Sequence, residues 1–477
     1  MEWIPEAASY DEIFTETGAT RPHYGRILSI LGDLDPREIA RRERLQNLSL
    51  LNQGITFAVY GDRRGTERVF PFDFVPRIVP AAEWRRLEAG LVQRITALNL
   101  FLKDVYTERA CLREGIVPWE LVLTRKEYKR ELLGVVPPRE IYTHVVGTDL
   151  IRGDDGEYLV LEDNCRCPSG VSYVLENRNL LKRSFPELFS AYAVRSVEVY
   201  PAQLAEVLRF VARRTDMSSP VVLTPGMYNS AYFEHSFLAR EMGVPLVEAA
   251  DLVVDDDHVF MRTTAGFERV DCIYRRIDDD FLDPLVFRSD SALGVPGLIN
   301  AYRAGNVALC NAPGAGVADD KAIYAYLPDL VRFYFDEDPI LGQVPTYVGA
   351  KPADFAYMVD HLGELVVKTT GDAGGYGMLM GPFATKEEIS AYRERMRGNP
   401  GGYIAQPVIQ LSSHGTWIDQ AFRPRRIDLR PFVLYGDRIQ VLPGGLTGVA
   451  LREGSLVVNS SQGGGSKDTW VLAEDGS

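Results

Sequence analysis

The stretch ELVVKTTGDAGGYGMLM, residues 364–380, joins an apolar segment ending at Lys368 to a glycine-rich loop. The apolar residues before Lys368 and after the loop predict two strands. Glycines let backbone amides close around a phosphate, and a lysine at a strand end offers a point charge to its oxygens. The stretch therefore predicts phosphate binding, with an ordinary hairpin and flexible tip as the alternative. The loop glycines are Gly371, Gly374, Gly375 and Gly377.

A second lysine, Lys321, follows two aspartates in VADDKAIYAYLP, residues 317–328. Aspartate is a preferred helix cap, so this segment predicts a helix that begins at the lysine. The alternative is a solvated lysine at a capped helix. Neither lysine lies in a GxxxxGK[ST] or GxGxxG pattern, which excludes the common P-loop and dinucleotide-binding assignments.

Candidate metal ligands occur in GTDLIRGDDGEYLVLEDNCRCPSG, residues 147–170. We predict a hairpin with arms at 139–146 and 157–161 around a Gly-Asp-Asp-Gly turn. Asp149 and Glu162 then lie on opposite arms, and Glu162 and Asn164 share one face of a strand. Two carboxylates and an amide oxygen suit Mg²⁺, which prefers hard oxygen ligands. The alternative is a polar strand edge that faces solvent.

Several arginines are candidates for binding an anion. Arg166 follows the metal segment, and Arg430 in RIDLRPF could reach a phosphate if its strand lines the cleft. Arg275 or Arg276 in YRRIDDD could hold an anionic substrate, or they could belong to a surface ion-pair cluster. The segment 459–467 is either an anion-binding nest or a loop.

Other reactive residue types lack a catalytic pattern. Cys165 and Cys167 lie too close together to form a bridge or chelate alone, so we interpret them as packing residues. His144 and His235 show no triad or zinc spacing, and we expect core or surface histidines. No serine lies in a GxSxG pattern, so the sequence offers no recognisable nucleophile.

Composition and net charge favour some classes of protein and exclude others. The 477 residues are 46% hydrophobic and 25% charged, which is typical of globular proteins. With 52 Lys+Arg against 66 Asp+Glu the net charge is −14, which disfavours binding to nucleic acid or an anionic membrane. Five cysteines without CxxC spacing argue against a disulfide framework. The acidic N-terminus and the lack of any apolar run of about 18 residues predict a cytoplasmic protein without a leader.

The pattern of elements predicts an α/β (α+β) protein. Helices are expected at 37–51, 82–106 and 204–213, and strands at 56–60 and 68–76. Buried strands alternate with helices from Val221 onward, which predicts a parallel α/β unit. Later strands are expected at 365–368, 403–406, 431–435, 440–442 and 455–458. We expect three units, 1–216, 217–314 and 315–477.

With these segments in view, nearly the whole chain resembles circularly permuted ATP-grasp proteins of type 2, the glutathionylspermidine synthetase-like bacterial group. The blocks TPGMYNSAYFEHSFLAREMGVPLVEAADL, YRRIDDDFLDPL and VNSSQGGGSKDTWV carry the likeness together with the segments above. The resemblance implies a permuted ATP-grasp fold with a Rossmann-like pre-ATP-grasp unit and a helical N-terminal region. In that family's usual order the metal carboxylates come last, whereas here they come first.

The resemblance also implies roles for the candidate residues. Lys321 and Lys368 would bind the ATP phosphates, the glycine loop would close over them, and Gln406 with the Val408 backbone would meet adenine. Asp149, Glu162 and Asn164 would hold one or two Mg²⁺ ions.

The sequence departs from the family pattern at two glycines. Polyamine-conjugating relatives carry an arginine where this chain has Gly147, so Arg166 or Arg430 would have to replace it. Close relatives often read GGLTR where this chain has GGLTG, with Gly448 in place of the arginine.

We therefore expect an ATP- and Mg²⁺-dependent ligase that joins a carboxylate to an amine or thiol through an acyl phosphate, with Arg166 and Arg430 as catalytic residues. The alternatives are an ATP-binding partner protein with reduced catalysis, a polyamine-conjugating synthetase and a phosphotransferase. The expected partners are small-molecule or peptide substrates. Partner proteins or a homo-oligomer stay open, and the first 130 residues could form a substrate wall or a dimer contact.

Overall fold

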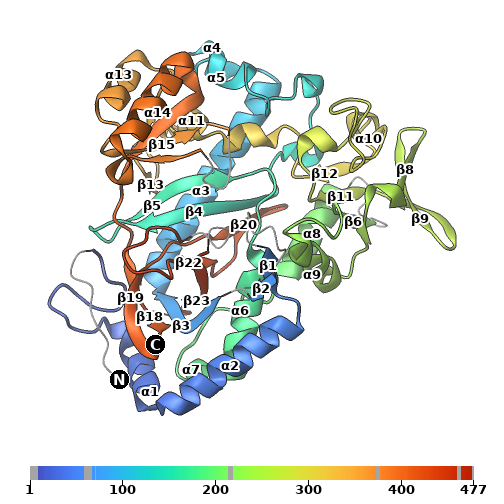
Figure 1. Cartoon of the computed structure of the whole chain (residues 1–477). Helices are drawn as coiled ribbons and strands as arrows, with labels where there is room; N and C mark the ends of the chain where they lie inside the picture. Colours follow the sequence, from blue (N-terminus) through green and yellow to red (C-terminus); the bar gives the residue numbers. More distant parts are fainter. Residues whose placement is uncertain are drawn as a thin grey trace.

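The computed structural model describes residues 9–58, 67–69, 71–212, 219–371, 377–458 and 463–474. Figure 1 shows a mixed α/β molecule built around a central sheet, with helices and smaller sheets above and below it and an arm that extends to one side. The mixed α/β class predicted from the sequence is confirmed.

The central sheet has five strands in the order β13-β5-β4-β20-β21. Strand β4 lies in its middle, is buried along its whole length and runs antiparallel to both neighbours. The long helix α3 (Ala81–Tyr106), which was predicted within one residue, contacts β20 and β21. The strands are β4 (Val145–Arg152), β5 (Tyr158–Asn164), β13 (Gly342–Gln343), β20 (Phe432–Tyr435) and β21 (Ile439–Val441).

The prediction that one hairpin arm spans 139–146 was wrong. A short 3-10 helix, η3 (Pro138–Glu140), occupies this position, and Arg139 and Glu140 have φ angles of 61° and 60°. Positive φ values are incompatible with a strand, so β4 begins only at Val145. The hairpin itself and its Gly-Asp-Asp-Gly turn are present, because β4 pairs with β5 on either side of that turn.

A second sheet, β22-β23-β3, joins distant parts of the chain. Strand β3 (Phe72–Val79) runs parallel to β23 (Gly465–Val471), and β22 (Thr447–Val449) completes the sheet. The predicted strand 68–76 is split into β2 (Glu67–Val69) and β3, because Pro71 has no amide hydrogen to donate. Nearby elements are β1 (Thr56–Ala58), α1 (Gly25–Asp33), α2 (Pro36–Asn52), α6 (Val171–Ser184), α7 (Pro186–Ser190) and the hairpin β18 (Ser413–Ile418) with β19 (Ala421–Arg426).

A third sheet, β12-β11-β6-β7, is parallel throughout, as the alternation of strands and helices predicted. Its members are β6 (Pro220–Leu223), β7 (Leu246–Val247), β11 (Cys272–Arg275) and β12 (Ala308–Cys310), with α8 (Tyr200–Val211), α9 (Tyr232–Met242) and α10 (Leu298–Arg303).

The projecting arm was not predicted. It consists of β8 (Leu252–Asp255), β9 (His258–Thr263) and β10 (Gly266–Val270), which form an antiparallel sheet between β7 and β11 in the chain. Figure 1 shows β8 and β9 extending away from the body.

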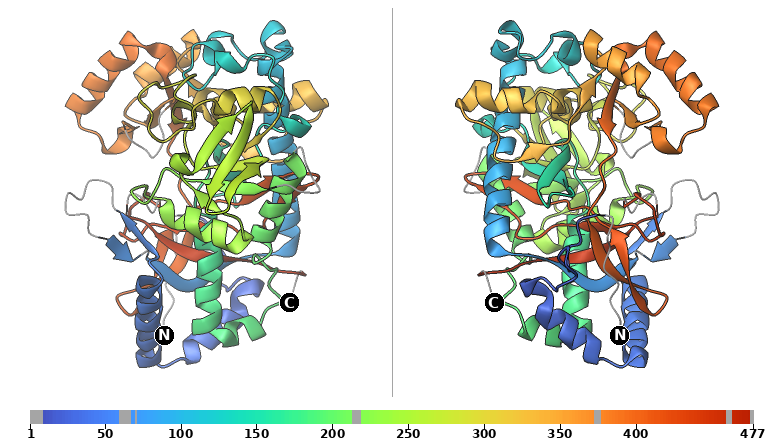
Figure 2. Two further views of the ribbon diagram at one scale, coloured as in Figure 1. Left: turned by 90° about the vertical axis from the view of Figure 1, so that its right-hand side faces the viewer. Right: turned by 90° about the vertical axis from the view of Figure 1, so that its left-hand side faces the viewer.

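The glycine-loop stretch belongs to a fourth sheet, β14-β17-β15-β16. Helices α13 (Pro352–Asp360) and α14 (Lys386–Gly398) pack on it through buried apolar residues such as Met358, Val367 and Met396. The two views of Figure 2 show this unit on the outside of the molecule. Its strands are β14 (Tyr347–Val348), β15 (Leu365–Thr369), β16 (Leu379–Met380) and β17 (Tyr403–Pro407).

The strand predicted at 455–458 is absent, since the described residues 451–458 contain no strand. The Ser455 hydroxyl instead accepts a hydrogen bond from the Val457 amide, a local bond that competes with pairing in a sheet.

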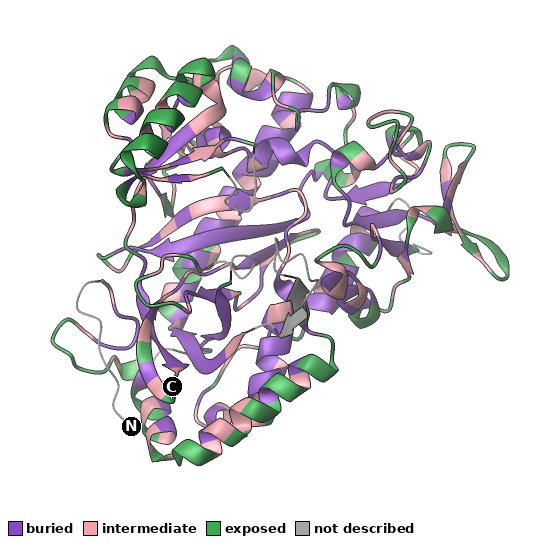
Figure 3. Ribbon diagram, viewed as in Figure 1, coloured by how far each residue is buried: buried purple, intermediate pink, exposed green. Residues whose placement is uncertain are grey.

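Burial separates the centre of the molecule from its periphery. Figure 3 shows buried residues along β3, β4 and β23, and exposed residues on the outer faces of α2, α14 and the arm. In the part of the chain that the structure describes, no helix combines the length and apolar character needed to cross a bilayer.

Candidate functional site

Asp149 and Glu162 are directly opposite each other on β4 and β5. A register shift follows at Leu150, which pairs with Val160, so Leu161 is the extra residue. The alternation of side chains along β5 places Glu162 and Asn164 on one face and Asp163 on the other. Asp163 is buried and accepts hydrogen bonds from Arg94, with the shortest at 2.6 Å. The face that carries Glu162 and Asn164 is therefore available for a ligand, while Asp163 forms an ion pair in the interior.

Arg430 joins this pair from the opposite side of β4. Its guanidinium contacts the Asp149 carboxylate through two nitrogens, and the bond from Nη2 to Oδ2 measures 2.6 Å. The chain reaches this position because Leu150 and Leu429 form a β-bridge just before β20. A third contact runs from Nη1 to the Ser169 carbonyl at 3.3 Å.

Lys321 approaches Glu162 from a different element. It opens the short helix α11 (Lys321–Tyr324), whose preceding residue, Asp320, accepts a hydrogen bond from the Ala322 amide at 2.7 Å. The predicted capped helix start is therefore confirmed. The ammonium Nζ of Lys321 lies 3.9 Å from Oε2 of Glu162.

Lys368 and Gln406 meet on neighbouring strands. Lys368 Nζ donates to Gln406 Oε1 at 2.9 Å, and Gln406 Nε2 donates to the Thr346 hydroxyl at 3.0 Å. Strands β15 and β17 are antiparallel, with Val366 opposite Gln406. This diagonal arrangement fixes the amide of Gln406 beside the lysine. Val408 follows the end of β17 and is half-buried.

Electrostatics links the charged groups into one cluster. Burial, the largest influence, raises the pKa of Asp149 despite the charge of Arg430, and the neighbouring Glu162 raises it further. Burial also acts to raise the pKa of Glu162, but Lys321, Lys368 and Arg430 more than offset this and lower it. The pKa of Lys368 is lowered, first by burial and then by Lys321. Such opposed shifts are typical of functional sites.

The glycine loop is described only at its two ends. Gly371 begins the loop, and Gly377 ends it with a φ of 71°, a conformation that favours glycine. The carbonyl of Gly377 accepts a hydrogen bond from the Tyr392 hydroxyl at 2.7 Å. Gly374 and Gly375 lie outside the described residues.

Arg166 lies in a separate acidic surrounding. Its Nε is 3.4 Å from Oδ1 of Asp278 and 3.7 Å from Oδ2 of Asp319. Burial raises the pKa of Asp319 to about 7, although Arg166 opposes this shift. Asp319 also accepts a hydrogen bond from the Cys165 amide. Asp319 was not predicted as a site residue, although its position two residues before Lys321 is a signal.

Two arginines considered as anion ligands are already paired. Arg275 contacts Asp279 at 2.6 Å, and Arg276 contacts Glu234 at 3.0 Å. Both arginines therefore belong to ion pairs, which was the alternative to binding an anionic substrate. All four side chains are buried, so these ion pairs lie in the interior and not on the surface. His144 and His235 are buried, and burial is the main cause that lowers the pKa of each, to about 3 and about 2. The segment 459–462 lies outside the described residues.

The residues present fit a divalent cation. Asn164 donates its amide nitrogen to the Gly147 carbonyl at 3.2 Å, which leaves its side-chain oxygen for a ligand. Together with Asp149 and Glu162 this gives the hard oxygen donors that Mg²⁺ prefers. Within the described residues no set of three or more His, Cys, Asp or Glu side chains forms a candidate cation site, so a cation held here would need the amide oxygen beside the two carboxylates.

The structure gives a physical reason for one of the two departures from the family pattern. A Cβ atom on Gly147 would lie 3.3 Å from Cβ of Pro168 and 3.4 Å from Cδ of Arg430, so both side chains lie beside that glycine. A Cβ atom on Gly448 would lie 2.6 Å from Oδ1 of Asp428 and 2.8 Å from the Val458 carbonyl. No side chain fits at 448 without displacement of these groups.

Comparison with known proteins agrees with this architecture. The sequence profile of the family described as circularly permuted ATP-grasp type 2 matches residues 76–450. An uncharacterized protein of Synechocystis sp. is 53% identical over 466 residues, which cover 97% of each chain.

One further relative and one solved structure of similar fold carry functional names. A protein of Frankia alni, named as a candidate glutamate–cysteine ligase 2-3, is 44% identical over 98% of this chain, but the match covers only 54% of that longer protein. The apo structure of a glutathione synthetase-like effector (GSS30) from Globodera pallida superposes with a TM-score of 0.61 at 12% identity, covering 92% of this chain and 98% of the effector. At that identity the likeness concerns the fold alone.

Proposed function

Because the chain belongs to the circularly permuted ATP-grasp type 2 family, we propose that it is an ATP- and Mg²⁺-dependent ligase that joins a carboxylate to an amine. One observation carries this proposal. Lys321, Lys368 and Arg430, from three separate elements, converge on the cross-strand pair of Asp149 and Glu162. Cations beside a pair of carboxylates are what a site for nucleotide phosphates and a divalent cation requires.

In the proposed reaction the substrate carboxylate attacks the γ-phosphorus of ATP, and ADP leaves. The amine then attacks the resulting acyl phosphate, loses a proton and releases inorganic phosphate. Lys321 and Lys368 neutralise charge on the transferred group, and Arg430 orients Asp149. Asp149, Glu162 and Asn164 would hold Mg²⁺, which supplies further charge neutralisation at the phosphates. Positioning and charge suffice for this chemistry, so no enzyme nucleophile is needed.

Gln406 is proposed to bind adenine beside Lys368. Its amide is already held by Lys368 and Thr346, so it presents a fixed edge to a base. As the family resemblance implies, the Val408 backbone is proposed to meet adenine, and the glycine loop is proposed to close over the phosphates. Arg166 is proposed to act on the substrate side, since it lies between Asp278 and Asp319 rather than beside Asp149.

The name of one relative narrows the substrate class. The Frankia alni protein is named for a ligase of two amino acids. We propose amino-acid or short-peptide substrates on this basis. The ligase name belongs to a protein of which this chain matches little more than half, so it does not identify the substrates.

A partner protein with reduced catalysis is the second candidate. Gly147 favours it, because the arginine of related synthetases is missing there. Arg430 weakens this argument, since its side chain lies beside Gly147 and contacts Asp149.

The proposal is tested by ADP release in the presence of Mg²⁺, ATP and pairs of amino acids or peptides. Wild type is expected to release ADP and free phosphate only when both carboxylate and amine are present. Glu162→Gln is expected to lose this activity. Phosphate found on a product would favour a phosphotransferase, and nucleotide binding without turnover on any pair would favour the partner protein.

A further inference from the structure

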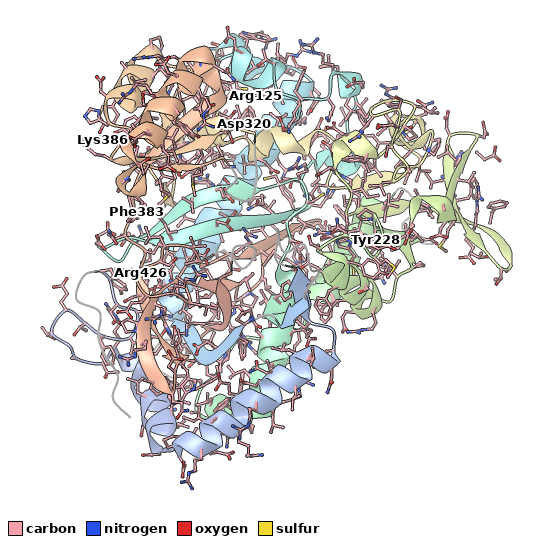
Figure 4. The ribbon with its side chains drawn as sticks, viewed as in Figure 1. Arg125, Tyr228, Asp320, Phe383, Lys386 and Arg426 are labelled. Carbon is pink, nitrogen blue, oxygen red and sulfur yellow. The ribbon has the colours of Figure 1, made fainter. Side chains whose placement is uncertain are left out.

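The capped start of α11 is held from outside by the N-terminal region. Nε of Arg125, which follows the short helix α5 (Glu120–Leu123), forms an ion pair with Oδ2 of Asp320 at 3.1 Å, without hydrogen-bond geometry. The Asp320 side chain is fully buried, and its other oxygen caps the helix that begins at Lys321. Figure 4 shows Arg125 and Asp320 close together where the N-terminal helices approach the glycine-loop unit.

The same guanidinium contacts the glycine-loop unit directly. Nη2 of Arg125 donates to the carbonyl of Gly401 at 2.9 Å. Gly401 lies two residues before β17, the strand that carries Gln406. Arg125 therefore bridges two segments that are about eighty positions apart in the chain.

Backbone hydrogen bonds continue this connection to both predicted phosphate lysines. The Lys321 amide donates to the Thr370 carbonyl at 3.2 Å, and the Thr370 amide donates to the Gly402 carbonyl at 3.0 Å. Thr370 lies two residues after Lys368 and just before the glycine loop. The elements that carry Lys321, Lys368 and Gln406 thus meet at one junction, and Arg125 spans it.

We propose that Arg125 is a positioning residue that fixes Lys321 relative to Lys368, so that both ammonium groups meet the same nucleotide. This inference rests on the proposed nucleotide site and gives part of the N-terminal region a function within it. Arg125 itself need not contact the ligand. Its effect is transmitted through the Asp320 cap on one side and the Gly401 carbonyl on the other.

Glu127 places the same segment beside the base of the loop. A Cβ atom on Gly371 would lie 3.7 Å from its Oε1, and one on Gly316 would lie 3.3 Å from its Cγ. Residues 125–127 therefore lie beside both the first residue of the glycine loop and the segment before α11. This proximity supports a positioning role for the segment as a whole.

Arginine is suited to this role because its planar group presents separate nitrogens to two acceptors. A lysine keeps the charge but offers a single centre, so it cannot reproduce both contacts at 3.1 and 2.9 Å. Arg125→Lys should consequently give an intermediate result between wild type and Arg125→Ala.

The test is calorimetric titration with a non-hydrolysable ATP analogue and Mg²⁺. Arg125→Ala is expected to weaken binding about tenfold, the effect of one charged hydrogen bond, and Arg125→Lys by less. Asp320→Asn keeps a helix cap but removes the charge partner, so it should also weaken binding. Arg113→Ala removes an exposed guanidinium of the same region as a matched control and should bind as wild type does.

The outcomes separate this inference from the proposed function. If wild type binds and both Arg125→Ala and Asp320→Asn bind equally well, Arg125 has no positioning role, even if their melting temperatures fall. If wild type does not bind the nucleotide, the proposed function itself fails. Should Arg125→Ala not fold, Asp320→Asn and Arg125→Lys decide the question.

Discussion

Two charged clusters in this protein use the same residue types in opposite ways. In the first, Glu12 contacts Arg77 at 2.5 Å and Arg152 at 2.7 Å, and all three side chains are buried. In the second, Arg430 contacts Asp149 at 2.6 Å, but Lys321 lies 3.9 Å from Glu162. We call the first cluster closed because short contacts join all its members, and the second, which also includes Lys368, open because of this longer separation.

The pKa shifts show what this difference means. Burial alone would raise the pKa of Glu12, but Arg152 and Arg77 lower it to about 2. Asp149 is also buried and also paired with arginine, yet its pKa is raised. The first cluster stabilises its own charges. The second leaves the charge of Asp149 incompletely stabilised, and a nucleotide with Mg²⁺ would compensate it.

The largest expected effect is loss of the closed cluster. Glu12→Gln leaves Arg77 and Arg152 buried with incomplete charge pairing, and breaking a buried pair costs about 3–5 kcal/mol. We expect this loss in the free energy of unfolding measured with urea, with unchanged affinity for the nucleotide analogue. A loss below about 1 kcal/mol would show that the cluster does not stabilise the fold.

The pH dependence of stability should report the same cluster. The folded pKa of Glu12 is about 2 against an ordinary 4.5, so its contribution is complete above 4.5 and is lost as pH falls toward 2. Of roughly 3 kcal/mol in total, about 2 kcal/mol should be lost by pH 3. Stability measured from pH 6 to pH 3 should therefore fall more steeply in wild type than in Glu12→Gln. Parallel curves for the two proteins would contradict this assignment.

Loss of a lysine in the open cluster should have the opposite pattern. Lys368→Met is expected to weaken nucleotide binding about a hundredfold without reducing the free energy of unfolding, because the burial of Lys368 already opposes its charge. Lys386→Met, an exposed position on α14 shown in Figure 4, is the matched control and should bind normally. A Lys368→Met protein that is destabilised but binds normally would reverse the comparison.

The smallest effect is expected for an exposed ion pair that belongs to neither cluster. Arg332 contacts Asp338 at 2.9 Å, and both side chains are largely exposed. Arg332→Ala should change the free energy of unfolding by less than about 1 kcal/mol and leave nucleotide binding unchanged. A larger change in the free energy of unfolding, measured with urea, would show that this ion pair stabilises the fold despite its exposure.

Local sequence patterns predicted the parts of the site that depend on near neighbours. The hairpin turn and the spacing of Asp149, Glu162 and Asn164 follow from the strand alternation, and the helix start at Lys321 follows from its aspartate cap. The strand before Lys368 was predicted from its apolar residues. Each of these features is decided within about fifteen residues of sequence.

The contacts that were not predicted join distant parts of the chain. Arg430 was only one of two candidates, and it reaches Asp149 across 281 positions because β20 pairs with β4. Arg125 reaches Gly401 across 276 positions. Strand pairing and loop packing decide these contacts, and no local pattern records them. The projecting arm was not predicted either, and in the structure the short 3-10 helix η4 (Ala249–Asp251), which begins with a Glu248–Asp251 capping box, separates β7 from β8.

The central claim is that the open cluster is a single site for nucleotide and Mg²⁺. The most direct test is the stability of wild type and Glu162→Gln with an ATP analogue, with and without Mg²⁺. At about 100 times the dissociation constant, wild type with Mg²⁺ should gain roughly 2.7 kcal/mol, and Glu162→Gln should gain much less. No gain in wild type, or an equal gain in Glu162→Gln, would contradict the claim.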